Sequence, residues 1–187
     1  PTGASVPLNS GIAPRNIQNV LGICKAYTTR VGEGPFPTEI DGELAHYIRE
    51  RGHEYGTVTK RPRRVGYLDC VALNYARRVS GINYLSLMLF DVLSGLKELK
   101  ICYAYELDGQ VINTIPATLA ELERCKPLYV TLPGFDEDIT HVTSFDELPE
   151  NAKNYIRKIE ELTKTEVVLF SVGPDRKQTI RLKEFFN

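Results

Sequence analysis

The sequence has no surplus of charge of either sign and no long hydrophobic run. Among its 187 residues, 23 are Lys or Arg and 24 are Asp or Glu, for a formal net charge of -1. Proteins that bind nucleic acid over a broad surface usually have a clear basic excess, so we expect no nucleic acid partner. A stretch of about 18 apolar residues is also missing, and we expect no membrane span.

Several familiar site patterns are missing as well. The sequence contains no Gly-x-x-x-x-Gly-Lys-Ser/Thr phosphate loop. The cysteines form no Cys-x-x-Cys pair and the histidines are scattered, so we expect no metal site and reduced cysteines in a cytoplasmic protein: Cys24, Cys70, Cys102, Cys125, His46, His53 and His141. The first residues, PTGASVPLNSG, lack the basic and apolar regions of a signal peptide. We expect them to lie inside a longer chain.

The strongest local feature is a cluster of positive charge in GTVTKRPRRVGYLD, residues 56–69. Arg61 and Arg63 alternate around Pro62, and an extended backbone before proline would point both guanidinium groups the same way. Such rigid forks of donors grip carboxylates or phosphates in a bidentate manner. Thr57 and Thr59 add hydroxyl groups. A solvated basic loop, or a run like a nuclear localisation signal, is the alternative at this point.

Hydrophobic periodicity and turn residues predict an order of elements along the chain. Asp69 is expected to cap a helix, and Thr118 opens a Thr-x-x-Glu capping box. Asp108 and Gly109 form a strong tight-turn signal. We predict helices over 14–27, 42–52, 70–81, 118–125 and 149–163, a loop over 28–39, and strands over 84–93, 99–107, 110–116, 127–133 and 166–174. Strands and helices interleave in the second half, which indicates an α/β protein.

Two further segments are candidate binding sites. The turn GPDR, residues 173–176, follows a predicted strand, and α/β sheets place ligands at the carboxyl ends of strands. Asp91 lies in the apolar run LMLFDVL, where a carboxylate without a donor would be costly to bury. Two adjacent N–H groups on the edge of a guanine base would suit this carboxylate. The alternatives are an ordinary turn at 173–176 and an aspartate that caps the next turn.

Taken together, these loops resemble the adenylosuccinate synthetase family. The resemblance rests on KAYTTRVGEGPFPTE (25–39), GTVTKRPRRVGYLD (56–69), DVLSGLKELKICYAY (91–105), DELPENAKNYI (146–156) and SVGPDR (171–176), and covers essentially all 187 residues. It implies the C-terminal part of an adenylosuccinate synthetase-type, P-loop NTPase-like fold, with a mixed sheet and flanking helices. We expect a mostly helical segment with the IMP and aspartate loops at 1–84, an α/β segment with the guanine loops at 85–187, and a longer parent enzyme.

The resemblance also implies a reaction and its partners. In this family the γ-phosphoryl group of GTP is transferred to the 6-oxygen of IMP, and the amine of L-aspartate then displaces phosphate to give adenylosuccinate. Mg²⁺ is implied as the cofactor, bound mainly by the upstream part of the enzyme. A homodimer is implied because an arginine from a neighbouring subunit completes the IMP site.

Site residues follow from the resemblance position by position. The residues implied to bind aspartate and IMP are Thr57, Val58, Thr59, Lys60, Arg61, Pro62, Arg63 and Val31. Those implied to bind GTP are Arg63, Leu89, Phe90, Asp91, Ser171, Val172, Gly173 and Pro174. Arg61 and Arg63 are the expected main contacts, while Lys60 and Arg64 are expected to be mainly solvated.

Two departures limit what the resemblance implies. Many family members have lysine two residues before the guanine-reading aspartate, but Leu89 stands there in this sequence. The family's phosphate loop, catalytic aspartate and catalytic histidine lie upstream, so no catalytic residue is expected here and the chain alone is predicted to be inactive. The alternatives are a non-catalytic nucleotide or nucleic-acid binding module, and a branch of the family that uses ATP or a 2-amino purine nucleotide.

Overall fold

The structure is a computed structural model that describes residues 2–184. Its helices are α1 (Ser5–Ser10), α2 (Gly42–Arg51), α3 (Cys70–Ser80), α4 (Leu119–Arg124) and α5 (Glu150–Thr163), with single 3-10 turns η1 (Pro14–Asn16), η2 (Phe90–Leu93), η3 (Phe145–Glu147) and η4 (Arg176–Gln178). Its strands are β1 (Leu21–Lys25), β2 (Thr28–Arg30), β3 (Arg64–Gly66), β4 (Leu68–Asp69), β5 (Tyr84–Met88), β6 (Leu96–Leu107), β7 (Gln110–Ile112), β8 (Lys126–Phe135), β9 (Glu166–Ser171) and β10 (Thr179–Arg181).

One sheet has the strand order β1-β5-β9-β10. Strand β5 is central and pairs in parallel with β1 on one side and β9 on the other, while β10 joins β9 in the antiparallel sense. The carboxyl ends of β5 and β9 therefore meet at the same edge of the sheet. That edge is where an α/β sheet most often binds a ligand.

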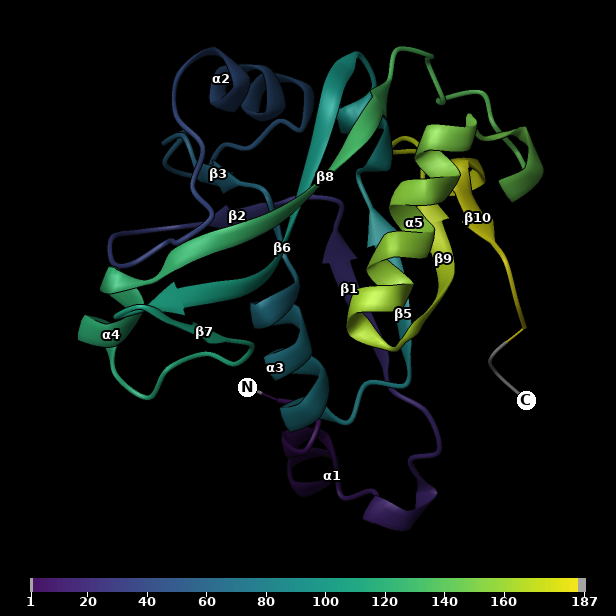
Figure 1. The fold of residues 1–187 in the computed structure, drawn as a ribbon. Coiled ribbons are helices and arrows are strands. Elements are labelled where there is room, and N and C mark those ends of the chain that lie inside the picture. The colour runs from purple at the N-terminus through teal and green to yellow at the C-terminus, as the bar shows by residue number, and fades with distance from the viewer. Residues whose placement is uncertain (1, 185–187) are drawn as a thin grey trace.

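A second sheet is built around the long strand β6. Strand β4 pairs with β6 in parallel, and β7 and β8 pair with it in the antiparallel sense. The tight turn between β6 and β7 is confirmed, since Asp108 and Gly109 both have positive φ, at 50° and 82°. A short ribbon of β2 and β3 lies beside α2, away from the first sheet (Figure 1).

The helices and both sheets share a core. Helix α5 buries Ala152, Tyr155, Ile156 and Ile159 on one stripe and lies in front of β9 and β5 in Figure 1. The ring of Phe90 stacks on that of Tyr155 with the ring centroids 5.8 Å apart. The same cluster of buried residues extends from Ala26 to Ile180, so the core crosses the expected boundary between residues 84 and 85.

Several predicted elements are confirmed. Helices α2, α3 and α5 occupy the predicted segments, and Asp69 accepts hydrogen bonds from the backbone N–H groups of Val71 and Ala72. The capping box of α4 is complete in both directions, between Thr118 and Glu121. No helix in the described part of the chain is long and apolar enough to cross a membrane.

The helix predicted over residues 14–27 is wrong. A single 3-10 turn at Pro14–Asn16 is followed by strand β1, so Leu21 and Cys24, which fit a helical stripe, belong instead to an extended strand. Pairing with β5 decides the outcome, because tertiary contacts override weak local preference. Gly22 allows the side chain of Ile82 to pack closely against β1, since a Cβ atom at Gly22 would lie 2.8 Å from Ile82. The predicted 28–39 loop contains β2, and the predicted strand from 84 ends at Met88.

Candidate functional site

The basic segment forms a narrow projecting loop with paired ends. The N–H of Gly56 donates to the carbonyl of Arg61, and the N–H of Lys60 donates back to the carbonyl of Gly56, both at 2.9 Å. Thr57, Val58, Thr59 and Lys60 form the exposed tip, where Val58 is 91% exposed. Lys60 takes a positive φ of 56° to close the turn. The tip therefore has few contacts that would hold it in one position.

Arg61 and Arg63 have different surroundings, although both were predicted to face one ligand. The side chain of Arg61 is exposed, and so is Pro62. Arg63 is half-buried, and its Nη1 lies 2.8 Å from the Oε2 of Glu54. Its Nε is buried without a hydrogen-bond partner among the described residues. Arg61 is thus free to reach a ligand, whereas Arg63 is already anchored to the body of the protein.

Glu54 is a buried carboxylate that the sequence did not reveal as important. Its side chain is 1% exposed. Its carboxylate accepts hydrogen bonds from Lys25, Tyr27 and Arg63 at 2.6, 2.6 and 2.8 Å. Burial is the largest influence and acts to raise its pKa, but the three hydrogen bonds outweigh it and the pKa of Glu54 is lowered. The only signal in the sequence was a lone acid two residues before the basic loop, and nothing indicated Lys25 or Tyr27.

Arg64 was expected to be solvated, and this is wrong. Its guanidinium group forms a two-pronged pair with the carboxylate of Glu39, with Nε 2.7 Å from Oε1. Its Nη1 also donates to the carbonyl groups of Gly32 and Gly34, at 3.2 and 2.8 Å. The guanidinium lies over the ring of Phe36, 5.4 Å from its centre. Arg64 thereby holds the 31–39 loop in place.

The 31–39 loop contains Val31, the residue implied to lie near the IMP ribose. Val31 is 78% exposed, which leaves its side chain open to contact. The guanidinium group of Arg30 stabilises the loop by donating hydrogen bonds to the carbonyl groups of Glu33 and Pro35 at 3.0 and 2.7 Å. Strands β2 and β3 then join this loop to the basic loop, because Arg30 pairs with Arg64 across the ribbon.

The second candidate site lies at the carboxyl ends of β5 and β9. Leu89 directly follows β5 and has a positive φ of 59°, which is uncommon for a residue with a bulky side chain. Its N–H donates to the Oγ of Ser171, the last residue of β9, at 2.9 Å. This bond ties the two strand ends together and directs the chain into η2, which carries Asp91.

Asp91 has a half-buried carboxylate that no donor satisfies completely. Its Oδ1 is buried without a hydrogen-bond partner in the part of the chain that the structure describes. Burial raises the pKa of this carboxyl group, and the neighbouring Arg51 partly opposes the shift. The residues that the structure describes therefore do not supply the donor that we expected for this oxygen. A ligand with N–H groups would satisfy it.

The turn after β9 is closed by Gln178. A Cβ atom at Gly173 would lie 2.2 Å from the Oε1 of Gln178, so a larger residue there would displace the end of that side chain. Gln178 in turn donates to the carbonyl of Thr140 at 3.0 Å. Pro174 is exposed beyond the turn. Phe90 and Val172 are fully buried core side chains, so they would line a nucleotide site only through their backbone atoms.

Helix α2 connects the two candidate sites. The Nε of Arg49 donates to the carbonyl of Arg63 at 3.0 Å, and the Nη2 of Arg51 donates to the carbonyl of Asp91 at 3.1 Å. Arg51 also donates to the carbonyl of Ser94 at 3.0 Å. The basic loop and the Asp91 turn are therefore both fixed to one short helix. The sequence did not indicate either contact.

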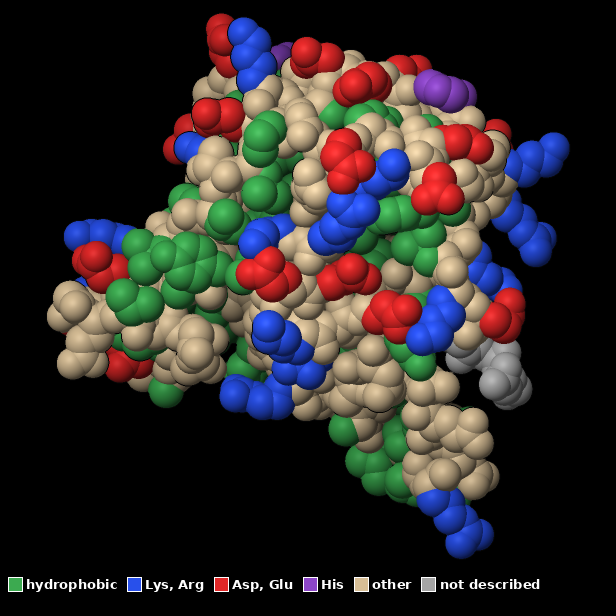
Figure 2. Space-filling model, turned by 45° about the vertical axis from the view of Figure 1, so that its right-hand side comes forward, with side chains coloured by type: hydrophobic (Ala, Val, Ile, Leu, Met, Phe, Trp, Pro, Cys, Tyr) green, Lys and Arg blue, Asp and Glu red, His purple; other side chains and the backbone are tan. Residues whose placement is uncertain are grey.

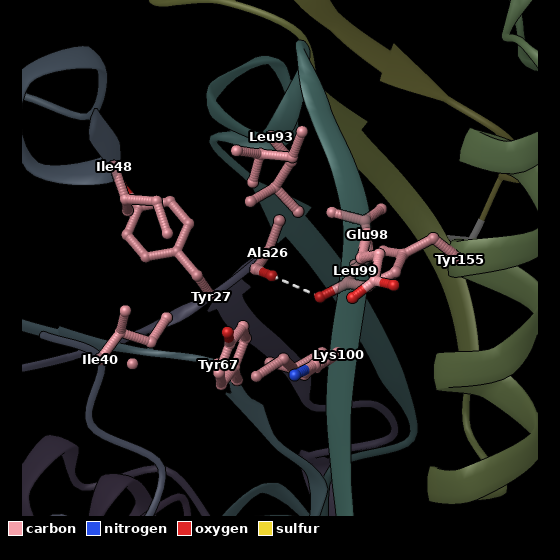
Figure 3. A pocket seen from close by; sticks show the side chains of 13 residues that line it. Ala26, Tyr27, Ile40, Ile48, Tyr67, Leu93, Glu98, Leu99, Lys100 and Tyr155 are labelled. Atoms are coloured by element: carbon pink, nitrogen blue, oxygen red, sulfur yellow. Dashed lines mark hydrogen bonds between the residues drawn. The ribbon is translucent and has the colours of Figure 1, made fainter. Parts of the chain in front are cut away.

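A small cavity between the β1–β2 connection, α2 and β6 is not part of either site. Its walls come from Tyr27, Ile48, Leu99 and their neighbours, and the hydroxyl of Tyr155 donates across it to the carbonyl of Ala26 at 2.7 Å (Figure 3). Its volume of about 10 Å³ leaves room for about one water molecule and excludes a nucleotide. The candidate sites lie instead on exposed loops.

Charge on the surface is mixed. Acidic and basic side chains are interspersed on the face shown in Figure 2. Pairs such as Arg157 with Glu150 and Lys158 with Glu161 account for part of this pattern. The described residues contain no group of three or more His, Cys, Asp or Glu side chains that could hold a metal ion.

Comparisons with known proteins agree on one family. A family model described as adenylosuccinate synthetase matches residues 1–180. Adenylosuccinate synthetase from Limosilactobacillus fermentum is 60% identical over 184 residues, which cover 98% of this chain and 43% of that protein. The structure of fully ligated adenylosuccinate synthetase from Plasmodium falciparum is 42% identical with a TM-score of 0.94, covering 97% of this chain and 44% of that chain.

A more distant structure shares the fold alone. Cyanophage S-2L succinoaminodeoxyadenylate synthetase, solved with dGMP and with dATP as an energy donor, is 17% identical with a TM-score of 0.52. The match covers 98% of this chain and 39% of that chain. In all of these matches the chain spans less than half the length of the protein to which it is similar.

Proposed function

Because the chain belongs to the adenylosuccinate synthetase family, we propose that it provides the substrate loops and the guanine loops of an enzyme that joins IMP and L-aspartate with the use of GTP. In that reaction the γ-phosphoryl group of GTP activates the 6-oxygen of IMP, and the aspartate amine then displaces phosphate. The parent enzyme would act in purine nucleotide biosynthesis as a ligase that forms a C–N bond.

The loops of this chain would bind and orient the substrates. Arg61, on the exposed loop, would bind the carboxylates of aspartate, and Arg63 would bridge aspartate and the phosphates of GTP. Thr57 and Thr59 on the loop tip would add hydroxyl donors. Closing a loop over a substrate with two negative charges excludes water and strengthens each ionic contact inside. Val31 would pack near the ribose of IMP.

The observation that carries the assignment of the nucleotide site is the unsatisfied oxygen of Asp91. A guanine base presents two adjacent N–H donors, and one carboxylate can accept both. Asp91 lies beside the Leu89–Ser171 bond at the carboxyl ends of two parallel strands. Ser171, Gly173 and Pro174 would form the other side of the base pocket.

Other components would come from outside the described residues. Mg²⁺ would be held mainly by the remaining part of the parent enzyme and would supply charge neutralisation at the transferred phosphoryl group. The general base and the general acid would also lie there. The parent would be a cytoplasmic homodimer, a location supported by four free cysteines.

Assays of two proteins test this proposal. The full-length protein that contains this chain is expected to form adenylosuccinate from IMP, L-aspartate and GTP with Mg²⁺ present. The isolated 187-residue chain is expected to form none, because the catalytic groups are outside it. A full-length protein that binds these substrates without turnover would contradict the proposal, and steady-state turnover by the isolated chain would contradict the division of roles.

A second candidate differs in the phosphoryl donor. Leu89 replaces a lysine that many family members have at this position, and its side chain could pack on a purine without selecting guanine. A parent that accepts ATP would follow the same reaction. Comparing GTP, ITP and ATP separates the two: guanine recognition by Asp91 predicts that ITP, which lacks the 2-amino group, has a KM about tenfold higher than GTP. Equal or better use of ATP would favour the second candidate.

A further inference from the structure

Arg63 is held by the body of the protein at three separate points. Its backbone N–H donates to the carbonyl of Glu54 at 2.8 Å, and its own carbonyl accepts from the Nε of Arg49 at 3.0 Å. Its guanidinium Nη1 donates to the Oε2 of Glu54 at 2.8 Å. Arg63 is therefore the fixed end of the basic loop, while the exposed segment 57–62 is the part that is able to close.

The carboxylate of Glu54 is itself kept in one orientation. Its Oε1 accepts hydrogen bonds from the Nζ of Lys25 and the hydroxyl of Tyr27, both at 2.6 Å, and its Oε2 faces Arg63. Tyr27 is 3% exposed and belongs to the core, so its ring is held in place by its neighbours. Lys25 also contacts the Oγ1 of Thr29 at 3.1 Å. The two oxygens thus have different partners, and only one orientation of Glu54 satisfies all of them.

The cluster of Lys25, Glu54 and Arg63 has more positive than negative charge. Two cationic side chains share one carboxylate, which leaves one net positive charge beside the loop. The side chains of Lys25 and Arg63 are 28% and 30% exposed, whereas that of Glu54 is 1% exposed. The cations therefore face outward over a buried counter-charge, an arrangement that attracts an anion without losing its own geometry.

We infer that Glu54 is a positioning residue that presents the guanidinium group of Arg63 to the anionic substrates, with Lys25 and Tyr27 fixing Glu54. This inference rests on the proposed function of the parent enzyme. Removing the charge of Glu54 leaves Arg63 without its partner inside the protein, so Arg63 must be ordered by the substrate. In such a variant, the side chain of Arg63 loses its rotational freedom only when substrate binds. In the wild-type enzyme that loss has already occurred before binding.

The test uses the full-length enzyme with the variant Glu54→Gln, which keeps the size of the side chain and removes its charge. The KM for L-aspartate is expected to rise about tenfold or more, since a charge-assisted hydrogen bond to the anchoring group is lost. The value of kcat at saturating aspartate is expected to change less than KM. Glu150→Gln is the matched control, because it removes a carboxylate paired with Arg157 on the exposed side of α5, and its KM should stay within about twofold of wild type.

Two further variants separate positioning from general stability. Glu54→Asp retains the charge and should recover part of the KM that Glu54→Gln loses. If Glu54→Gln does not fold, Glu54→Asp is used for the test instead. Its shorter side chain should raise the KM for L-aspartate more than it lowers kcat. In a cycle with Arg63→Gln, the double variant should be little worse in KM than Arg63→Gln alone, since Glu54 acts through Arg63.

The outcomes distinguish this inference from the proposed function. If the wild-type enzyme forms no adenylosuccinate, the proposed function fails. If the wild-type enzyme is active and Glu54→Gln lowers thermal stability while KM and kcat stay within about twofold of wild type, Glu54 is only structural and the inference is overturned. Additive effects of Glu54→Gln and Arg63→Gln on KM would overturn it as well.

Discussion

At the scale of single residues, neighbouring arginines have separate tasks. Arg61 is exposed, Arg63 is anchored to Glu54, and Arg64 forms a two-pronged pair with Glu39. The sequence showed a cluster of cations but not their partners. Glu54 and Glu39 lie 9 and 25 positions away from the arginines they bind, a separation at which no local pattern predicts contact. Only one arginine of these three is left fully open to a ligand.

Asp91 has a half-buried carboxylate with one oxygen that lacks a donor among the described residues, which leads to a first prediction. Replacing it by asparagine removes a half-buried charge with one unsatisfied oxygen. The free energy of unfolding of the 187-residue chain should rise by about 1 kcal/mol, as measured by urea denaturation. The KM of the full-length enzyme for GTP should rise about tenfold or more, since asparagine has one acceptor oxygen in place of two.

The dependence on pH provides a check of that prediction. Burial raises the pKa of Asp91 in the folded chain. Above that pKa, the ionised carboxylate therefore lowers the free energy of unfolding. As the pH falls through the raised pKa, the carboxyl group is protonated in the folded state and the unfavourable contribution disappears. The stability difference between Asp91→Asn and wild type should therefore shrink on acidification. If the stability difference between the two proteins grows towards low pH, the ionised carboxylate of Asp91 is not the source of the unfavourable contribution.

At the scale of elements, Asp69 joins a helix to the second sheet. One carboxylate oxygen caps α3 through the N–H groups of Val71 and Ala72, and the other accepts from the hydroxyl of Tyr105 on β6. The sequence predicted the cap, because aspartate before an apolar helix is a local signal. It did not predict Tyr105, because that contact depends on how α3 packs against β6.

The double role of Asp69 gives a second prediction. Asp69→Ala removes the cap and leaves a buried tyrosine hydroxyl without its acceptor. The chain should lose about 3 kcal/mol of unfolding free energy. Thr118→Ala is the matched control, because it removes only the exposed cap of α4 and should cost about 1 kcal/mol. Denaturant unfolding of both variants measures the difference, and equal losses would show that Tyr105 contributes nothing.

At the scale of the whole molecule, the first sheet has an open edge in the described chain. Strand β1 pairs with β5 on one side, and Ile23 on β1 is 76% exposed. The chain also spans less than half the length of its relatives. An exposed edge strand with an apolar side chain is a template for pairing with a second copy.

The third prediction follows from that edge. The isolated chain should self-associate as its concentration rises, and Ile23→Lys should reduce this association while changing the unfolding free energy by less than about 0.5 kcal/mol. Size-exclusion chromatography with light scattering measures the change in mass. Val111→Lys is the matched control, since Val111 is 66% exposed on β7 in the other sheet. If Val111→Lys has the same effect as Ile23→Lys, the β1 edge is not responsible.

The sequence by itself determined the features that depend on neighbouring residues and on matched motifs. The α/β class, α2, α3 and α5, the cap at Asp69, the turn at Asp108 and Gly109, and the family followed from local propensity and from motif order. Tertiary structure decided the rest. Pairing with β5 made residues 21–25 a strand, and packing placed Glu54 under Arg63, Arg64 on Glu39, and α2 between the two sites. These outcomes depend on contacts between distant segments, and a local pattern contains no information about the distance between them in space.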